Sequence, residues 1–273
     1  MKRRQFIKRG ALFVPMIFVP RLIRAQVQLG NARLSNAQLG ITNAAASGNG
    51  LLANLIAYWR CEDSDNADWA DATGNGHTLT KHGNLLQTPL TAKHLLGRQV
   101  STSTYGDSAS TDFLRTGSWT LSIWGRTASA IDGEVLASEF GTGHNWFIFG
   151  PGGGVFEFGM RKADDSGNIV AVSAASFTTG VYNHTVVGWD AALQQIWIQV
   201  NNEPRTGAAI VSYTDTPRTD SENFTINGFS GGGSGIDGSS NNGGIDEIGY
   251  WTRSLSTADV TNLQTLFYDD FTN

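Results

Sequence analysis

The sequence contains a single cysteine, Cys61, among 273 residues. A chain with one thiol cannot close an internal disulfide, so its stability must come from a large apolar core, from bound metal, or from both. Cys61 follows Tyr58 and Trp59 in an apolar run, and this setting predicts a buried, inert thiol and not a nucleophile.

Positive charge is also scarce, since 19 Lys and Arg face 24 Asp and Glu and the net charge is -5. A protein that binds nucleic acid or an anionic membrane surface by bulk charge carries a basic patch. The composition therefore argues against a nucleic-acid partner.

Lysine is scarce, whereas 33 Gly, 14 Phe and eight Trp are typical of a turn-rich β protein and not of a helical bundle. Short apolar runs alternate with glycine-rich turns, which predicts antiparallel strands in a sandwich of two sheets. The expected fold is an all-β sandwich over residues 51–270 that ends in a short C-terminal helix with Ser254 as its N-cap. Expected strands in the middle of the chain are 135–138, 145–149, 155–160, 169–172 and 210–213.

We expect the first 25 residues to form a signal peptide, which is not part of the fold. Lys2, Arg3, Arg4 and Lys8 precede an apolar run at 10–20 that is too short to span a bilayer. The segment resembles the twin-arginine signal of bacteria, although Lys2 departs from that pattern and leaves the general secretory route open. We expect a secreted, periplasmic or cell-surface protein with no membrane span in the mature chain.

Residues 26–50 are rich in Ala, Asn, Gln, Ser and Gly and show no sustained period, so we interpret them as a linker or N-terminal arm. The alternative is a short hairpin or helix that docks on the body of the protein.

Four motifs in order resemble laminin G-like domains of the concanavalin A-like lectin/glucanase type, over residues 51–267. The resemblance implies a jelly-roll sandwich of two antiparallel sheets. The motifs are Ala57, Tyr58, Trp59 with an Asp-x-Thr-Gly-Asn-Gly turn from Asp71; the strand from Trp119 to Trp124; the pair 181–189 and 196–202; and the closing Gly-Ile-Asp-Glu strand from Gly244.

The same resemblance implies a calcium ion near Asp71, Asn75 and Asp246, which would supply the hard oxygen ligands that calcium prefers. A different reading of the same residues stays open. Asp71 and Asn75 can bond the backbone of their own turn, and Asp246 can bond loop amides.

Catalytic patterns are missing from the sequence. A retaining glycosidase needs two carboxyl groups about 5 to 5.5 Å apart, which on a strand means acids two or four residues apart. Glu134 and Glu139 are five residues apart, while Asp246 and Glu247 are adjacent. The five histidines are dispersed, so no histidine metal cluster is expected.

Binding by loops or aromatic surface is the remaining interpretation. Candidate ligand residues are Trp146, whose ring can stack on a sugar, and Asp237 and Asn241 in the long loop 228–244. Core packing is the alternative for every Trp. We expect a non-catalytic module that binds a glycan or an extracellular protein and is stabilised by calcium; a polysaccharide-acting enzyme and a cell-surface adhesion component are the alternatives.

Overall fold

A computed structural model describes residues 49–84, 86–88, 93–101, 103–108, 117–127, 135–139, 146–150, 154–161, 168–174, 177–209, 223–228 and 243–272. All of them belong to one compact unit, residues 44–273. The expected signal peptide, nearly all of the expected arm and the expected strand 210–213 lie outside the described residues. Within the described part, no helix has the length and apolar character needed to cross a membrane.

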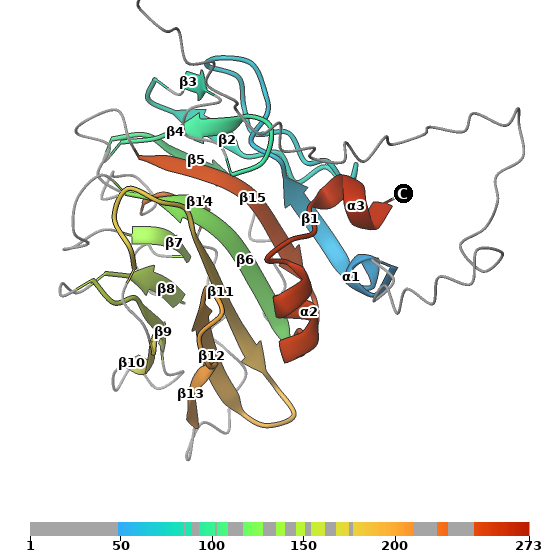
Figure 1. Cartoon of the computed structure of the whole chain (residues 1–273), viewed down its shortest axis with the longest axis vertical. Helices are drawn as coiled ribbons and strands as arrows, with labels where there is room; N and C mark the ends of the chain where they lie inside the picture. The colour runs from blue at the N-terminus through green and yellow to red at the C-terminus, as the bar shows by residue number, and fades with distance from the viewer. Residues whose placement is uncertain are drawn as a thin grey trace, which may run out of the picture. The chain divides into compact units, whose positions relative to one another are not determined.

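The described strands form two antiparallel sheets, which we call sheet A and sheet C (Figure 1). Sheet A contains β1 (Leu55–Trp59), β3 (Leu86–Thr88), β4 (Gly97–Gln99), β6 (Trp119–Arg126), β11 (Asn183–Asp190), β12 (Gln195–Val200), β13 (Thr206–Ala209) and β15 (Gly244–Trp251). Sheet C contains β2 (Thr80–His82), β5 (Tyr105–Ser108), β7 (Val135–Glu139), β8 (Trp146–Phe149), β9 (Glu157–Arg161), β10 (Asn168–Val172) and β14 (Phe224–Ile226).

The last strand, β15, is central to sheet A. It pairs with β6 along one edge, while its other edge pairs with β4 at Gly244 and Ile245 and with β1 from Ile248 to Trp251. The first strand of the fold is therefore held by the last one, and the partners β4 and β1 leave an interval between them at Asp246 and Glu247.

The main core lies between the sheets and is rich in aromatic rings. Trp119, Leu121 and Ile123 of β6 all point into it, as their alternation predicts, and Trp119 stacks on Tyr250 with ring centroids 5.7 Å apart. Trp124, on the opposite face of the same strand, is not part of this core. Two facing apolar layers without a disulfide confirm the expected antiparallel sandwich.

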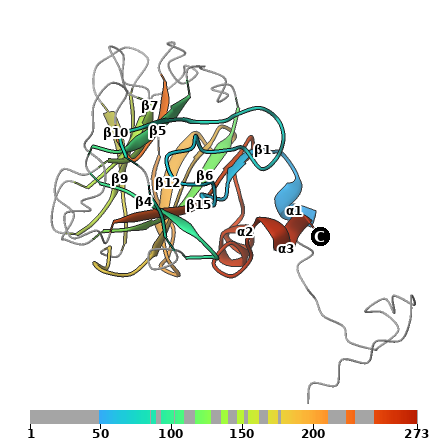
Figure 2. The same cartoon turned by 90° about the horizontal axis from the view of Figure 1, so that it is seen from above.

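A second apolar cluster covers the outer face of sheet A. The helices α1 (Asn49–Leu52), α2 (Thr257–Asn262) and α3 (Tyr268–Thr272) lie on the side of sheet A opposite to sheet C (Figure 2). Leu51, Trp251 and Val260 meet in this cluster. One face of sheet A therefore packs on sheet C and the other is covered by the ends of the fold.

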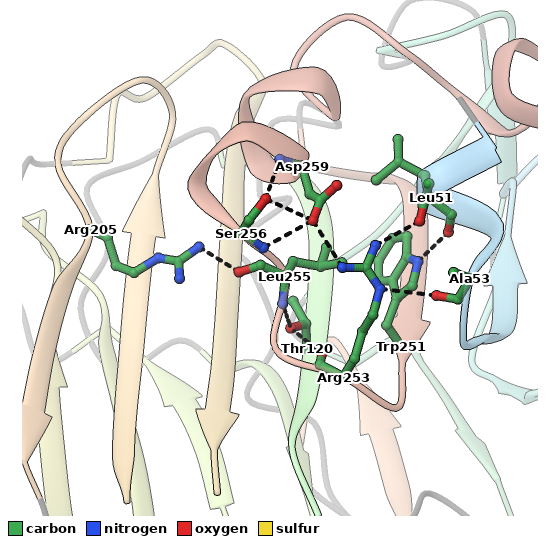
Figure 3. A network of polar contacts seen from close by, with 10 residues as sticks. Leu51, Ala53, Thr120, Arg205, Trp251, Arg253, Leu255, Ser256 and Asp259 are labelled. Atoms are coloured by element: carbon green, nitrogen blue, oxygen red, sulfur yellow. Dashed lines mark hydrogen bonds and ion pairs between the residues drawn. The ribbon is translucent and has the colours of Figure 1, made fainter. Parts of the chain in front are cut away.

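The expected closing helix is present, but it begins two residues later than predicted. Ser256, and not Ser254, is its N-cap: the Ser256 hydroxyl accepts from the Asp259 N–H, and the Asp259 carboxylate accepts from the Ser256 N–H (Figure 3). This reciprocal capping box satisfies two end groups that Ser254 could not reach.

Candidate functional site

The interval in sheet A at Asp246 and Glu247 is a distortion of β15. The pairing of β15 with β6 shifts register between Asp246 and Gly249, so this edge contains a β-bulge. Glu247 has a φ of 44°, a left-handed conformation that is rare for a non-glycine residue. The bulge places two consecutive carboxylates where the ladder is interrupted.

Asp246 fills the interruption by binding a neighbouring loop. One carboxylate oxygen accepts hydrogen bonds from the backbone N–H groups of Lys93 and His94, at 2.7 and 2.8 Å, and the other accepts from the Glu247 N–H at 3.0 Å. Burial raises the pKa of Asp246 to about 8, against the opposing effect of the N–H donors. These contacts with loop amides are the ones that the alternative interpretation of Asp246 describes.

Glu247 is 2% exposed and turns toward β1 and α3. Its Oε2 accepts a hydrogen bond from the Tyr58 hydroxyl at 2.5 Å, while its buried Oε1 accepts none among the described residues. Burial raises the pKa of Glu247 to about 7, and hydrogen bonds from Tyr58 and the Tyr268 amide act in the opposite direction. The carboxylate therefore keeps an oxygen available for a positive partner.

Glu62 and His94 lie beside Glu247. One ligand atom of each of the three residues lies within 4.8 Å of the other two. Glu62 follows β1 and pairs with Arg60 at 2.9 Å, and the His94 ring stacks on Phe267 with centroids 4.3 Å apart. Burial raises the pKa of Glu62. This is the group of metal-ligand residues found in the described part of the chain.

Asp71 organises the turn that the sequence places around it. Its Oδ1 accepts from the Thr73 N–H, the Thr73 hydroxyl and the Tyr58 N–H, and its Oδ2 accepts from the His77 N–H. The Asn75 amide donates to the Ile56 carbonyl at 2.9 Å. These are the turn-backbone contacts of the alternative interpretation.

Asp71 and Asp246 are connected through Tyr58, whose N–H binds Asp71 and whose hydroxyl binds the neighbour of Asp246, but neither acid belongs to the metal-ligand group. Each carboxylate retains one oxygen with a single hydrogen bond, and the Asn75 side chain donates by its nitrogen and keeps its oxygen. These oxygens suit a calcium ion chemically. Calcium at Asp71, Asn75 and Asp246 stays a prediction.

Three residues were predicted from the sequence to bind a glycan: Trp146, Asp237 and Asn241. Trp146 is 3% exposed and lies in the main core, with its ring centroid 5.2 Å from that of Trp119, so its face does not reach a ligand. The other seven Trp are also at most 5% exposed. Six of them pack in the two apolar clusters, and Trp124 stacks on the His184 ring. Asp237 and Asn241 lie outside the described residues.

Sheet C instead presents an aromatic and polar patch at its β2 and β5 edge, formed by His82, Tyr105, Asp107 and Asn223. A side chain at Gly106 would meet Leu79 and Trp69 of the core, so its neighbours Tyr105 and Asp107 face outward. The rings of His82 and Tyr105 stack at 4.3 Å, and Asp107 accepts from His82 at 3.0 Å and from Asn223 at 3.4 Å.

Sequence reasoning missed both groups for the same reason. Glu62, His94 and Glu247 come from three distant segments, and the sheet C patch joins β2, β5 and β14. The adjacent acids in the closing strand were visible in the sequence, but the bulge that separates their directions was not.

This architecture is that of a lectin-type β-sandwich. The family model of the concanavalin A-like lectin/glucanases superfamily matches residues 100–261, which is more than half of the chain. The protein belongs to this superfamily. No curated protein sequence matches it.

Solved structures share the fold at low sequence identity. Domain 4 of AbnA, an extracellular GH43 arabinanase from Geobacillus stearothermophilus in complex with arabinotriose, has a TM-score of 0.56 and 13% identity over 78% of this chain and 99% of that domain. The binding domain of Paraclostridial Mosquitocidal Protein 1 has a TM-score of 0.57 and 12% identity, over 77% of this chain and 52% of that one. The binding domain of botulinum neurotoxin DC in complex with SialylT has values of 0.54 and 13%, over 77% and 50%. The chain thus spans about half the length of these toxin domains.

Proposed function

We propose that the protein is an exported, non-catalytic recognition module that binds a glycan through the outer face of sheet C. The observation that carries this proposal is the patch of His82, Tyr105, Asp107 and Asn223 on the outside of a lectin-type sandwich. Similar structures include domains crystallised with arabinotriose and with SialylT, which supports a glycan over a protein ligand. The signal-like N-terminal sequence supports export from a bacterium.

The chemistry of the patch suits a sugar. An aromatic ring offers an apolar surface to the C–H face of a pyranose or furanose, while a carboxylate and an amide hydrogen-bond its hydroxyl groups. Tyr105 and His82 are both partly exposed, and the Asp107 side chain retains 13% exposure. Their stacking and the His82–Asp107 contact hold the groups in place before a ligand arrives, which lowers the entropic cost of binding.

The acids of the closing strand support a binding role over a catalytic one. Asp246 is 0% exposed and Glu247 is 2% exposed, and both are engaged by neighbouring backbone or hydroxyl groups. A glycosidase needs two carboxyl groups that reach the scissile bond from solvent. This pair does not offer that geometry.

Calcium is the cofactor that we propose with this function, held by Asp71, Asn75 and Asp246. Its role is to stabilise the fold, because an ion held by these residues would join the turn after β1 to the last strand, β15. This proposal is supported by the side-chain oxygen that each of the three residues keeps with at most one hydrogen bond, and which can therefore bind a calcium ion.

A glycan array followed by calorimetry with arabino-oligosaccharides and sialylated oligosaccharides tests the binding proposal, with and without calcium. Replacing Tyr105 by Ala should weaken binding about five- to thirtyfold, since stacking of a sugar on one ring is worth about 1–2 kcal/mol. Tyr105→Phe, which keeps the ring, should retain most of the affinity, and Leu193→Ala, on an exposed turn of sheet A, should not change it. Equal affinity in Tyr105→Ala contradicts the site, and sugar release from a polysaccharide panel contradicts the non-catalytic function.

A further inference from the structure

The three residues Glu62, His94 and Glu247 offer metal-ligand atoms at a place separate from the proposed glycan site on sheet C. Glu62 comes from the segment that follows β1, His94 from the loop before β4, and Glu247 from the bulge of β15. These three segments are the ones that meet where β4 and β1 leave β15 unpaired.

The distances between the ligand atoms are close to those around one ion. All three atoms lie within 4.8 Å of one another. In the tetrahedral arrangement that zinc prefers, two ligand atoms that each lie about 2.1 Å from the ion are about 3.4 Å apart. The ligand atoms therefore have to close by up to about 1.4 Å when an ion binds. Rotation of the Glu62 and His94 side chains, which are both only partly buried, supplies this movement.

Glu247 supplies the second, independent sign of a ligand. Its side chain is almost fully buried, and its Oε1 has no hydrogen-bond donor among the described residues although Oε2 is bound by Tyr58. A buried carboxylate oxygen without a donor is costly, because desolvation is not repaid by a hydrogen bond. A cation at this position removes that cost.

The charges around the group also favour a cation. Glu62, Glu247 and the neighbouring Asp269 face one guanidinium, that of Arg60, which binds both Glu62 and Asp269. Asp246 adds a further carboxyl on the adjacent residue, though its oxygens are taken by loop amides. A divalent cation would neutralise the two negative charges of Glu62 and Glu247.

The donor set identifies the class of ion. Calcium takes six to eight oxygen ligands, whereas an imidazole nitrogen with two carboxylates suits zinc and related transition-metal ions. Outer contacts are in place to orient the ligands: Tyr58 binds Glu247, Arg60 binds Glu62, and Phe267 stacks on the His94 ring. We propose that Glu62, His94 and Glu247 form a binding site for a divalent transition-metal ion such as Zn²⁺, which clamps the end of β1 and the loop before β4 onto β15.

The test uses the untagged full chain, stripped with a chelator and titrated calorimetrically with Zn²⁺ alone. We expect one zinc ion per chain and a melting temperature raised by about 5 °C when zinc is well above its Kd. His94→Ala and Glu247→Gln should each weaken zinc binding at least tenfold. In the Co²⁺-loaded protein, His94→Ala should also alter the visible absorption bands of the metal.

Matched controls separate this site from surface binding. His82→Ala removes a partly exposed histidine that contacts a carboxylate on sheet C, and Glu203→Gln removes an exposed acid; both should leave zinc affinity unchanged. Glu62→Gln, at a partly exposed position, serves if Glu247→Gln fails to fold. The proposal is overturned if zinc does not bind, if binding survives His94→Ala, if it is lost in His82→Ala, or if only calcium binds. None of these outcomes affects the glycan experiment.

Discussion

At the scale of single residues, His184 shows how the fold fixes one protonation state. It is fully buried on β11, where Nδ1 lies 2.6 Å from the Gln264 amide nitrogen and Nε2 lies 2.6 Å from the Ser122 hydroxyl. An amide nitrogen can only donate, so Nδ1 accepts and Nε2 carries the proton. Burial lowers the pKa of His184 to about 3, with a smaller contribution from the charge of Lys93.

This histidine should make the protein less stable in acid. Between pH 6.5 and about 3 the unfolded chain binds a proton at His184 and the folded chain does not, so the contribution of this residue to the unfolding free energy falls as pH falls. The loss is about 1.4 kcal/mol per pH unit below 6.5. Urea unfolding at several pH values between 4.5 and 7.5 measures it.

Substitution of His184 isolates its contribution from that of other groups. The raised pKa values of Asp246 and Glu247 give the opposite slope, so the comparison is between wild type and His184→Gln at each pH. The difference in unfolding free energy should shrink toward low pH. Leu193→Ala, at an exposed position that carries no titratable group, should keep the wild-type slope. Parallel pH curves for wild type and His184→Gln contradict the assignment.

At the scale of elements, Arg253 connects the two ends of the fold. Its guanidinium donates to Asp259 in α2 at 2.9 Å, to the Ala53 carbonyl at 3.0 Å and to the Gly50 carbonyl at 2.7 Å (Figure 3). The short helix α1 has too few residues to be stable alone, so it depends on such contacts and on the packing of Leu51.

Replacing Arg253 by Lys should release α1 from α2. A lysine keeps the charge but cannot donate to three acceptors in a fork, so we expect a loss of about 1–3 kcal/mol in unfolding free energy. Hydrogen exchange of residues 49–55 should become faster. Ser256→Ala, which removes only the helix cap, should cost about 1 kcal/mol and leave exchange in residues 49–55 unchanged. Equal protection of this segment in Arg253→Lys would show that Arg253 does not hold it.

The elements also show what a sequence can predict. The turn around Asp71 was expected because all but one of the donors it uses lie within six residues. The alternation in β6 was expected because a strand shows its two faces directly. The N-cap was misplaced because Ser254 and Ser256 offer the same hydroxyl, and Asp259 decides between them. The Glu62, His94 and Glu247 group was invisible because strand pairing brings it together.

At the scale of the whole molecule, the ends of the described fold lie together. The first strand pairs with the last, α1 is in contact with α3, and Tyr58 binds Glu247, 189 residues later. The first and last segments of the described fold are therefore neighbours in space.

A circular permutant tests this property. Joining Thr272 to Asn49 by a short flexible linker and opening the chain in the exposed turn 191–194 keeps every described strand pair. We expect a melting temperature within about 10 °C of that of a linear 49–272 protein. Opening between Asp246 and Glu247 instead divides β15 and should prevent folding. Failure of the first permutant with success of the second contradicts the closed arrangement.

The pairing of β1 with β15 also sets the order of events during synthesis. The first strand leaves the ribosome long before its partner, and β6 likewise waits for β15 on one edge. Contacts this distant in sequence form slowly, because the intervening chain must be closed first. Stable cotranslational intermediates are therefore not expected, and we expect the apolar strands of the growing chain to stay exposed until β15 has been made. We therefore expect folding only after β15 has left the ribosome.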